Sequence, residues 1–581
     1  MKIRSRKIVE QGGREGFALL YSVITSFVVG SMVVVMFTAA ESSKKVSDVT
    51  VAKTRARFIA RGALSSVEEE LRTTLANFDA PVLSGSKIVD GQTVSYEVSE
   101  VGQSSTLIEK TGIQRIVQPY EITARINTGD AVGTASRIIN AEYTPLFQFA
   151  VFYDNDLEIL PGPSMTLTGR VHSNGDLFLG SGGTLTFNSN HVRVLGEIFR
   201  SRKIGGPTRG NVDFRKYVAN PFDASEPIQY ERMLSASQLG PSSVSGYDSA
   251  FNLGYDSNGD GDFSDNGDYL PFEFGSQALW SQPDGYGTAG NTVRTGDHGV
   301  TYVSTPSVNS IQTWIDPGDG SGTLEKGYYH DNADLAILVD ENGLTFTAIM
   351  SDGTDVTGLV APAVEISDIY DARQSRSSSN RSTVLEVDMG MLTGLGLLSS
   401  EGLIYAAHEG LGEGLDASGV VLKNGSSLEG DVTVVSEGPV YIQGDYNTVN
   451  KKAAAVIADA VNLLSNSWDN SKEKGVLPRA SETDYNVAIV TGSYESEVGR
   501  YNGGFENLPR FHENWSGIDC NILGSFVNSY DSVHATGSIG GVSNLYRPPG
   551  RKWSYDPDFN TVGNLPPYTP MAVTINSVVS W

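Results

Sequence analysis

The longest apolar segment of the chain lies near its N-terminus. Residues 17–40, FALLYSVITSFVVGSMVVVMFTAA, form a run of 24 residues without a charge. About 20 apolar residues in a helix cross a hydrocarbon layer about 30 Å thick, so this run predicts a transmembrane helix. The apolar core of a secretory signal peptide is shorter, at about 7–15 residues. An ordinary signal anchor remains the alternative.

The next segment predicts an amphipathic helix that continues the first one. Residues 41–78 contain no proline, and apolar residues recur every three or four positions, as on one buried face of a helix. Gly62 is the weakest position, costing about 1 kcal/mol relative to alanine. One helix over residues 17–78 would be about 90 Å long, half anchor and half stalk. Its predicted apolar face consists of Val49, Ala52, Ala56, Ile59, Ala63, Val67, Leu71, Leu75 and Phe78.

Beyond the stalk the pattern changes to short strands. Residues 79–150 alternate apolar and polar positions with breaks at glycine, aspartate or asparagine, which predicts an antiparallel sheet packed on the stalk. In residues 151–205 the strands shorten and regular turns separate them, and residues 402–447 repeat this pattern. Such short rungs predict a β-helix or solenoid, with a sandwich as the competitor. The expected strands in the first of these segments are 157–159, 165–167, 170–172, 177–179, 185–187 and 192–195.

The C-terminal third completes the predicted architecture. Residues 381–581 are expected to form a β-rich head, within which residues 452–464, KAAAVIADAVNLL, predict a short helix. The fold class is therefore α+β and predominantly β. A long N-terminal transmembrane and stalk helix is followed by a β-sheet domain and an irregular head that is solenoid-like or a sandwich.

A candidate calcium site lies in residues 206–380. This segment is rich in Gly, Ser, Asp and Asn, which favours its interpretation as an insertion. Residues 255–268, YDSNGDGDFSDNGD, resemble a Ca²⁺ loop of EF-hand or dockerin type, because Ca²⁺ takes six to eight oxygen ligands from such a loop. The usual acid at position 12 is replaced by Gly267, so an acidic hydrated turn is the alternative. The candidate ligands are Asp256, Asn258, Asp260, Asp262, Asp265 and Asp268.

The distribution of charge predicts an orientation and excludes one class of partner. Residues 1–16, MKIRSRKIVEQGGREG, carry a net charge of +3, and the whole chain carries −26, which leaves −29 from Phe17 onward. Positive flanks stay cytoplasmic, so the single-pass helix is expected to place the head outside the inner membrane, in the periplasm or at the cell surface. A chain this acidic has no basic surface for nucleic acid.

The junction between the basic leader and the apolar run resembles the class III leader of type IV prepilins. The segments ARFIARGALSSVEEEL and FAVFYDNDLEILPGPSMTLTGRVHSNGD look like parts of PilX-like exported proteins. The resemblance implies that a prepilin peptidase cuts between Gly16 and Phe17, and that other pilin-like subunits contact the helix. Mature pilins usually carry at their fifth residue a glutamate that pairs with a neighbour's N-terminal ammonium, whereas this chain has Tyr21. A missing glutamate at this position is expected in a minor subunit at a filament tip, because such a subunit has no neighbour above it.

Motifs for catalysis are scarce. The chain contains neither G-x-S-x-G nor H-E-x-x-H, and its lone cysteine, Cys520, is expected in the core. His172 and His408 occupy similar strand–turn positions, where hydrogen bonds to the turn explain them better than a metal does. A glycan-active enzyme with paired carboxylates such as Asp176 or Asp431 is a distant alternative.

Two functions from different classes follow. The first is a membrane-anchored, non-enzymatic minor pilin-like subunit of a type IV pilus or a type II secretion-like pseudopilus, with a large head for adhesion or interaction. The second is a calcium-stabilised, surface-anchored protein outside any filament that binds an extracellular glycan or a cell surface.

Overall fold

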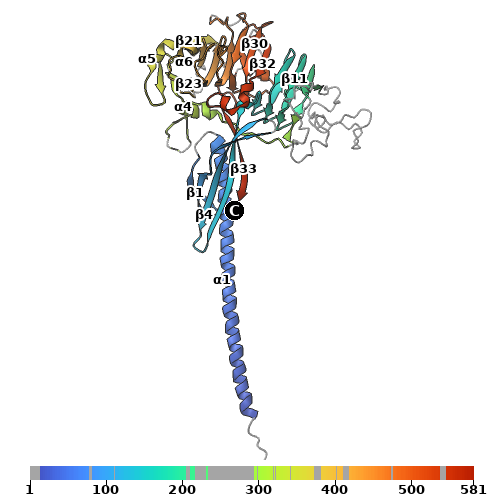
Figure 1. The fold of residues 1–581 in the computed structure, drawn as a ribbon, viewed down its shortest axis with the longest axis vertical. Coiled ribbons are helices and arrows are strands. Elements are labelled where there is room, and N and C mark those ends of the chain that lie inside the picture. Colours follow the sequence, from blue (N-terminus) through green and yellow to red (C-terminus); the bar gives the residue numbers. More distant parts are fainter. Residues whose placement is uncertain are drawn as a thin grey trace, which may run out of the picture.

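The computed structural model places a long helix, an antiparallel sheet and a β-rich head one after another along the molecule (Figure 1). We call the sheet together with the helix segment that it covers the stem. The structure describes residues 14–76, 81–109, 112–204, 210–215, 230–232, 293–296, 299–317, 320, 322–340, 342–371, 381–400, 402–409, 418–470, 472, 476–534, 536 and 545–580.

One uninterrupted helix, α1 (Arg14–Ala76), contains the predicted transmembrane segment and the predicted stalk as far as Ala76. Every side chain from Phe17 to Val51 is exposed, and burial begins at Ala52 and Ala56. The predicted apolar face is thus confirmed from Ala52 to Leu75, where it packs on the stem sheet, whereas Val49 is exposed and Phe78 lies outside the described residues. The α1 side chains buried in this contact are Ala56, Ile59, Ala60, Ala63, Leu64, Val67, Leu71 and Leu75.

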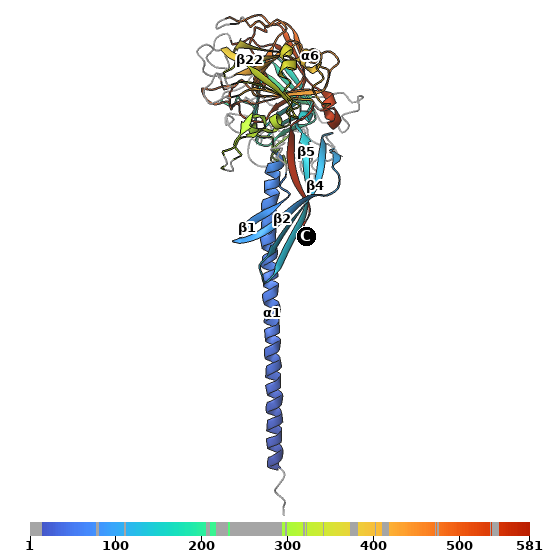
Figure 2. The same ribbon diagram turned by 90° about the vertical axis from the view of Figure 1, so that its left-hand side faces the viewer.

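The stem sheet is antiparallel and lies along the C-terminal half of α1 (Figure 2). Its order is β1-β2-β4-β5-β33, and β3 also pairs with β4. Gly133, near the start of β5, explains the close approach of helix and sheet, because a Cβ there would lie 2.3 Å from the Ala56 carbonyl carbon. The strands are β1 (Ser84–Val89), β2 (Gln92–Glu100), β3 (Ser105–Ile108), β4 (Gln114–Asn127), β5 (Val132–Pro145) and β33 (Met571–Ser580).

The head, residues 146–570, is inserted between β5 and β33, which pair with each other in the stem sheet. Its main sheet contains a row of parallel strands in which Val151 aligns with Val171 and Val171 with Val192. In spatial order the row is β16 (Val293–Arg294), β12 (Val192–Val194), β9 (Val171–Ser173), β6 (Val151–Tyr153), β31 (Phe526–Asn528), β28 (Ala488–Thr491), β26 (Ala454–Leu464), β25 (Val432–Gln443), β23 (Gly402–His408) and β19 (Leu335–Val339).

Two further rows of parallel strands accompany the first. One row begins with the parallel strands β8 (Met165–Thr168), β11 (Thr184–Asn188) and β14 (Asn211–Arg215). A second parallel group continues it, because its strand β32 contacts β8; this group is β27 (Thr483–Asn486), β30 (Asp519–Gly524) and β32 (Gly550–Tyr555). The other row has two groups. The first is β7 (Leu157–Ile159), β10 (Leu177–Leu179) and β13 (Ile198–Phe199). The second is β22 (Arg381–Asp388), β24 (Gly419–Lys423) and β29 (Arg510–Phe511), in which β24 pairs with the C-terminal half of β25 and β29 with that of β26.

The order of the rows differs from the order of the chain. The chain enters the head at β6, in the middle of the main row, and proceeds outward to β16. It resumes at β19, at the opposite end, and returns inward until β31 pairs with β6. This arrangement brings both ends of the head back to the stem.

Strands antiparallel to their partners and several short helices complete the described part of the head. The strands β20 (Phe346–Met350), β21 (Val364–Tyr370) and β15 (Tyr230–Arg232) pair with β19, β22 and β14, respectively. The remaining elements are η1 (Leu146–Gln148), η3 (Val308–Ile311), β17 (Trp314–Ile315), β18 (Glu325–Lys326), α4 (Tyr328–Asp331), α5 (Thr357–Val360), η4 (Ala361–Ala363), α6 (Met389–Thr393), η5 (Phe505–Asn507), η6 (Pro557–Asn560) and η7 (Val562–Asn564).

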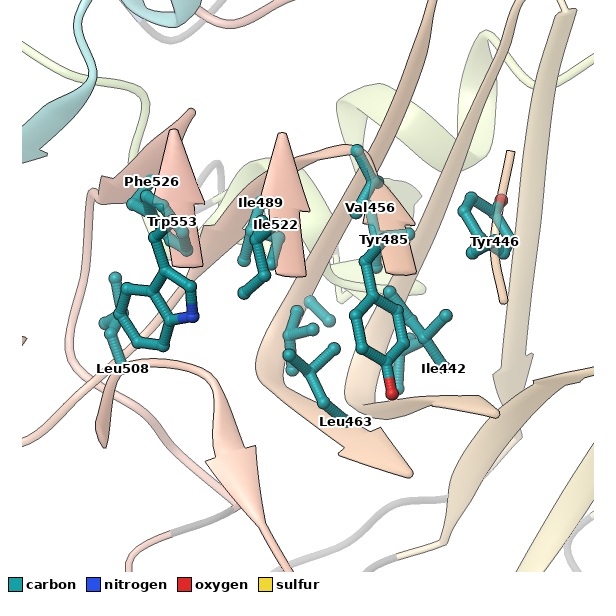
Figure 3. Packing of buried hydrophobic residues seen from close by; sticks show 14 of the residues in the cluster. Ile442, Tyr446, Val456, Leu463, Tyr485, Ile489, Leu508, Ile522, Phe526 and Trp553 are labelled. Carbon is teal, nitrogen blue, oxygen red and sulfur yellow. The ribbon is translucent and has the colours of Figure 1, made fainter. Parts of the chain in front are cut away.

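The core of the head lies between the rows of strands. Tyr485, Ile489 and Trp553 come from different strands and line up in the same apolar interior (Figure 3). A second cluster, which includes Phe152 and Tyr405, covers the outer face of the main row. The strands of this row are therefore buried on both faces. The predicted short strands of residues 151–205 are confirmed as β7 to β12.

The predicted helix at 452–464 is wrong, because this segment is strand β26 (Ala454–Leu464). All of its residues are buried: Val456 and Leu463 face the interior, whereas Ala455 and Ile457 face the covered outer surface. A strand that is buried on both faces is a continuous apolar run, and a run of this kind does not differ in periodicity from a buried helix.

Two predicted boundaries are also corrected. Part of the predicted insertion, 206–380, belongs to the sheets of the head, because β19 lies between β20 and β23 with Leu335 and Ile337 fully buried. The last ten residues before Trp581, in β33, belong to the stem sheet and not to the head. In both cases the pairing partner is far away in the sequence.

Candidate functional site

The exposed N-terminal half of α1 is the strongest functional feature of the described residues. Phe17, Phe27 and Phe37 are 71%, 80% and 69% exposed, respectively. An apolar surface of this size in water marks a site of contact with protein or membrane. With 24 residues at about 1.5 Å each, the segment has the length and composition of a membrane-spanning helix or a signal sequence.

The residues of the predicted leader junction lie in this helix. Gly16 and Phe17 fall within its first turn, since α1 begins at Arg14. Tyr21 follows one turn later and is 73% exposed. The structure therefore presents Phe17 and Tyr21 on the free part of the helix, away from the stem sheet.

The predicted calcium ligands, residues 256–268, lie outside the described residues. Within the described part of the chain, no group of three or more His, Cys, Asp or Glu side chains is arranged to hold a metal ion. The calcium loop therefore stays a prediction from sequence.

The histidines and the cysteine singled out in the sequence are buried. His172 stacks on Phe152 with 5.0 Å between ring centroids, and its Nε2 lies 3.0 Å from Oδ1 of Asn174. Burial lowers the pKa values of His172 and His408 to about 4. Cys520 is fully buried, and burial raises the pKa of its thiol. These environments favour neutral, structural side chains.

The aspartates considered for catalysis link successive turns of the head. Oδ1 of Asp176 accepts a hydrogen bond from the backbone N–H of Glu197 at 2.8 Å, and Oδ1 of Asp431 accepts one from Ala453 at 2.8 Å. In the same way, Asp156 accepts one from Asp176 at 2.7 Å. Each carboxylate thus satisfies a backbone donor in the next turn, which is a structural role.

A pair of buried glutamates, Glu158 and Glu506, was missed by the sequence reasoning. They are 5% and 6% exposed, and Oε2 of Glu506 accepts a hydrogen bond from the backbone N–H of Leu160 at 3.1 Å. Burial raises the pKa of Glu506 to about 7, although the Arg551 guanidinium opposes the shift. The available signal was a charged residue inside an apolar strand, as in Leu157-Glu158-Ile159.

The space beside this pair is small. Glu158 lines a cavity of about 10 Å³ together with Tyr153, Lys203 and Asp531. Such a volume holds about one water molecule. Lys203 also forms ion pairs of 2.6 Å with Asp156 and Glu495. The geometry fits a buried polar cluster better than a saccharide-cleaving pair.

Substituting Glu506→Gln should make the protein more stable at high pH. The folded-state pKa of about 7 lies above the ordinary value of 4.5, so ionisation penalises the folded state as pH rises from 4.5 through 7. Glutamine keeps an acceptor for Leu160 and removes this penalty. Urea unfolding should show a gain that is about 2 kcal/mol larger at pH 8 than at pH 5.

The matched control is Glu97→Gln, at an exposed position of β2, which should change stability equally at both pH values. His172 and His408 act in the opposite direction below pH 6.5, so the difference between variant and wild type is the relevant quantity. A pH-independent effect of Glu506→Gln would contradict the assignment.

No known protein family, no curated protein and no solved structure matches this chain.

Proposed function

We propose that this chain is a membrane-anchored, pilin-like minor subunit, placed at the tip or initiation point of a type IV pilus or a type II secretion-like pseudopilus. The observation that carries the proposal is the division of α1 into two halves. Its N-terminal half is apolar and exposed, whereas its C-terminal half is buried against an antiparallel sheet. This is the shape that the resemblance to prepilins implies, because one helix serves both as anchor and as assembly surface.

The head would project from the filament or the membrane as an irregular β-solenoid. Three rows of parallel strands and aligned interior positions such as Leu157, Leu177 and Ile198 support this description. The insertion of the head between β5 and β33 leaves the stem intact as a unit for packing. We infer that the head serves adhesion or interaction, and that the subunit is not an enzyme.

A terminal position is supported by Tyr21 and by size. A tyrosine offers no carboxylate to a neighbour's N-terminal ammonium, and a charge buried in an apolar environment is costly unless it is paired. A head of more than 400 residues, 146–570, is also bulky for a lattice in which subunits advance by a few helical turns. Both features favour few copies at one end of a filament.

The proposal is tested by the N-terminus of the mature protein. Membranes from cells with prepilin peptidase should yield a chain that begins at Phe17, and membranes from cells without the peptidase should yield one that begins at Met1. The variant Gly16→Leu should remain uncleaved in both. Gly30→Leu, within the same helix, is the control and should be cleaved normally, because its Cβ position faces open space outside the helix.

A chain that begins at Met1 in both strains would overturn the pilin-like assignment. The function would then be the competing one, a surface-anchored protein outside any filament that binds a glycan or a cell surface and is stabilised by Ca²⁺ at residues 256–268.

A further inference from the structure

A cavity of about 170 Å³ lies where the stem meets the head. Arg115 and Thr574 line it from the stem, on β4 and β33, whereas His191, Arg193 and Arg294 line it from the head. Both parts therefore contribute to its wall.

The positive charge of this cavity follows from the strand register. His172, Arg193 and Arg294 are aligned on β9, β12 and β16. Their neighbours Val171, Val192 and Val293 point into the core of the head, so the alternation of a strand turns these three side chains outward. Parallel strands lie about 4.8 Å apart, and the two arginines therefore stand side by side.

These side chains are buried although they are charged or polar. Arg193 and Arg294 are 6% and 7% exposed, and His191 is 7% exposed. Among the described residues the lining carries three arginines and one carboxylate, Glu109, and Arg115 is ion-paired with both Glu109 and Glu142. In a chain with a net charge of −26, a described lining in which arginines outnumber carboxylates is opposite to the general trend.

His191 provides a further polar group in the same wall. Its Nδ1 is buried and has no hydrogen-bond partner among the described residues. Burial, together with the positive charge of Arg193, holds the pKa of His191 well below its ordinary value. A neutral imidazole beside two guanidinium groups has a donor available for an acceptor that enters the cavity.

We propose that this cavity binds the oxyanion group, carboxylate or phosphate, of a small soluble ligand, held by Arg193 and Arg294 and assisted by His191. Guanidinium groups bind carboxylate and phosphate oxygens in pairs of parallel hydrogen bonds. A bound anion would accept hydrogen bonds from the neighbouring side chains Arg193 and Arg294 of the head, and it would lie opposite Arg115 and Thr574 of the stem.

Binding is tested by calorimetric titration of the full-length protein in detergent, with inorganic phosphate in one arm and glucuronate in the other, at constant ionic strength set with chloride. A single saturable site is expected in at least one arm, and the arm that binds more tightly distinguishes a phosphate from a sugar acid. Arg193→Gln and Arg294→Gln should each weaken binding by about tenfold, as for loss of a charged hydrogen bond. Arg125→Gln, on the exposed face of β4, should leave affinity within about twofold.

A second pair of variants does not depend on the buried arginines. Thr301 lines the cavity and is exposed, so Thr301→Asp should fold and should repel the anion, whereas Thr301→Asn should bind as wild type does. The absence of saturable binding in both arms would overturn the proposal, as would equal affinity of Thr301→Asp and Thr301→Asn.

Discussion

Deleting residues 1–45 is expected to move the protein from the membrane fraction to the soluble fraction without lowering its unfolding temperature. The deleted part includes the whole uncharged run, and its described side chains make no buried contact with the stem. Its apolar side chains are those that a hydrocarbon layer would cover. The truncated chain needs no disulfide, because Cys520 is its only cysteine, so it should fold in the cytoplasm. Fractionation and a thermal melt within about 2 °C of the full chain would show this.

The control keeps the length of the helix and changes only its polarity. Val28→Lys, Val33→Lys and Phe37→Lys, combined in the full chain, place three charges in the run, each costing about 2.5–3.5 kcal/mol at the centre of a membrane helix. This variant should also leave the membrane fraction. A truncated chain that still sediments with membranes would mean that another part of the protein holds it there.

The largest single-residue loss of stability is expected for Trp515→Ala in the head. Trp515 is fully buried in the interior cluster, and its ring meets that of Phe511 edge-on with 5.7 Å between centroids. Removing a buried indole leaves a cavity that the rigid rows of strands cannot close, at a cost of about 3–5 kcal/mol. Urea unfolding of the chain that lacks residues 1–45 measures this loss.

Two further variants distinguish the loss of the buried indole volume from the loss of its N–H group and from the removal of any tryptophan. The indole Nε1 of Trp515 has no hydrogen-bond partner among the described residues, so Trp515→Phe removes an unsatisfied donor, keeps an aromatic ring beside Phe511 and should cost about 1.5 kcal/mol or less. Trp314→Ala, at a position that is 43% exposed, should cost less than about 1 kcal/mol. Similar losses for all three variants would contradict the role assigned to Trp515.

The helix and the short strands could be predicted from the sequence because their signals are local. The apolar repeat from Ala52 to Leu75 specifies the buried face of α1 without reference to any partner. The strands β7 and β10 coincide with the predicted segments 157–159 and 177–179, since glycine- and asparagine-rich turns limit each run of apolar residues.

Elements that depend on distant partners could not be predicted in the same way. β26 has the composition of a helix, and only its position between two parallel strands makes it a strand. β19, within 206–380, pairs with β23 about 70 positions away, and β33 pairs with β5 more than 400 positions away, so both acquire their roles from distant residues.

Some of the candidate sites also follow from local sequence, whereas others depend on distant partners. The sequence by itself determined the exposed apolar helix with Gly16, Phe17 and Tyr21, because an uncharged run of this length has the same consequence in any fold. Only the tertiary structure placed Glu158 near Glu506 and aligned Arg193 with Arg294. The physical reason is that strand pairing sets which residues are neighbours, and burial sets their charge, whereas neither can be read from a single segment of the chain.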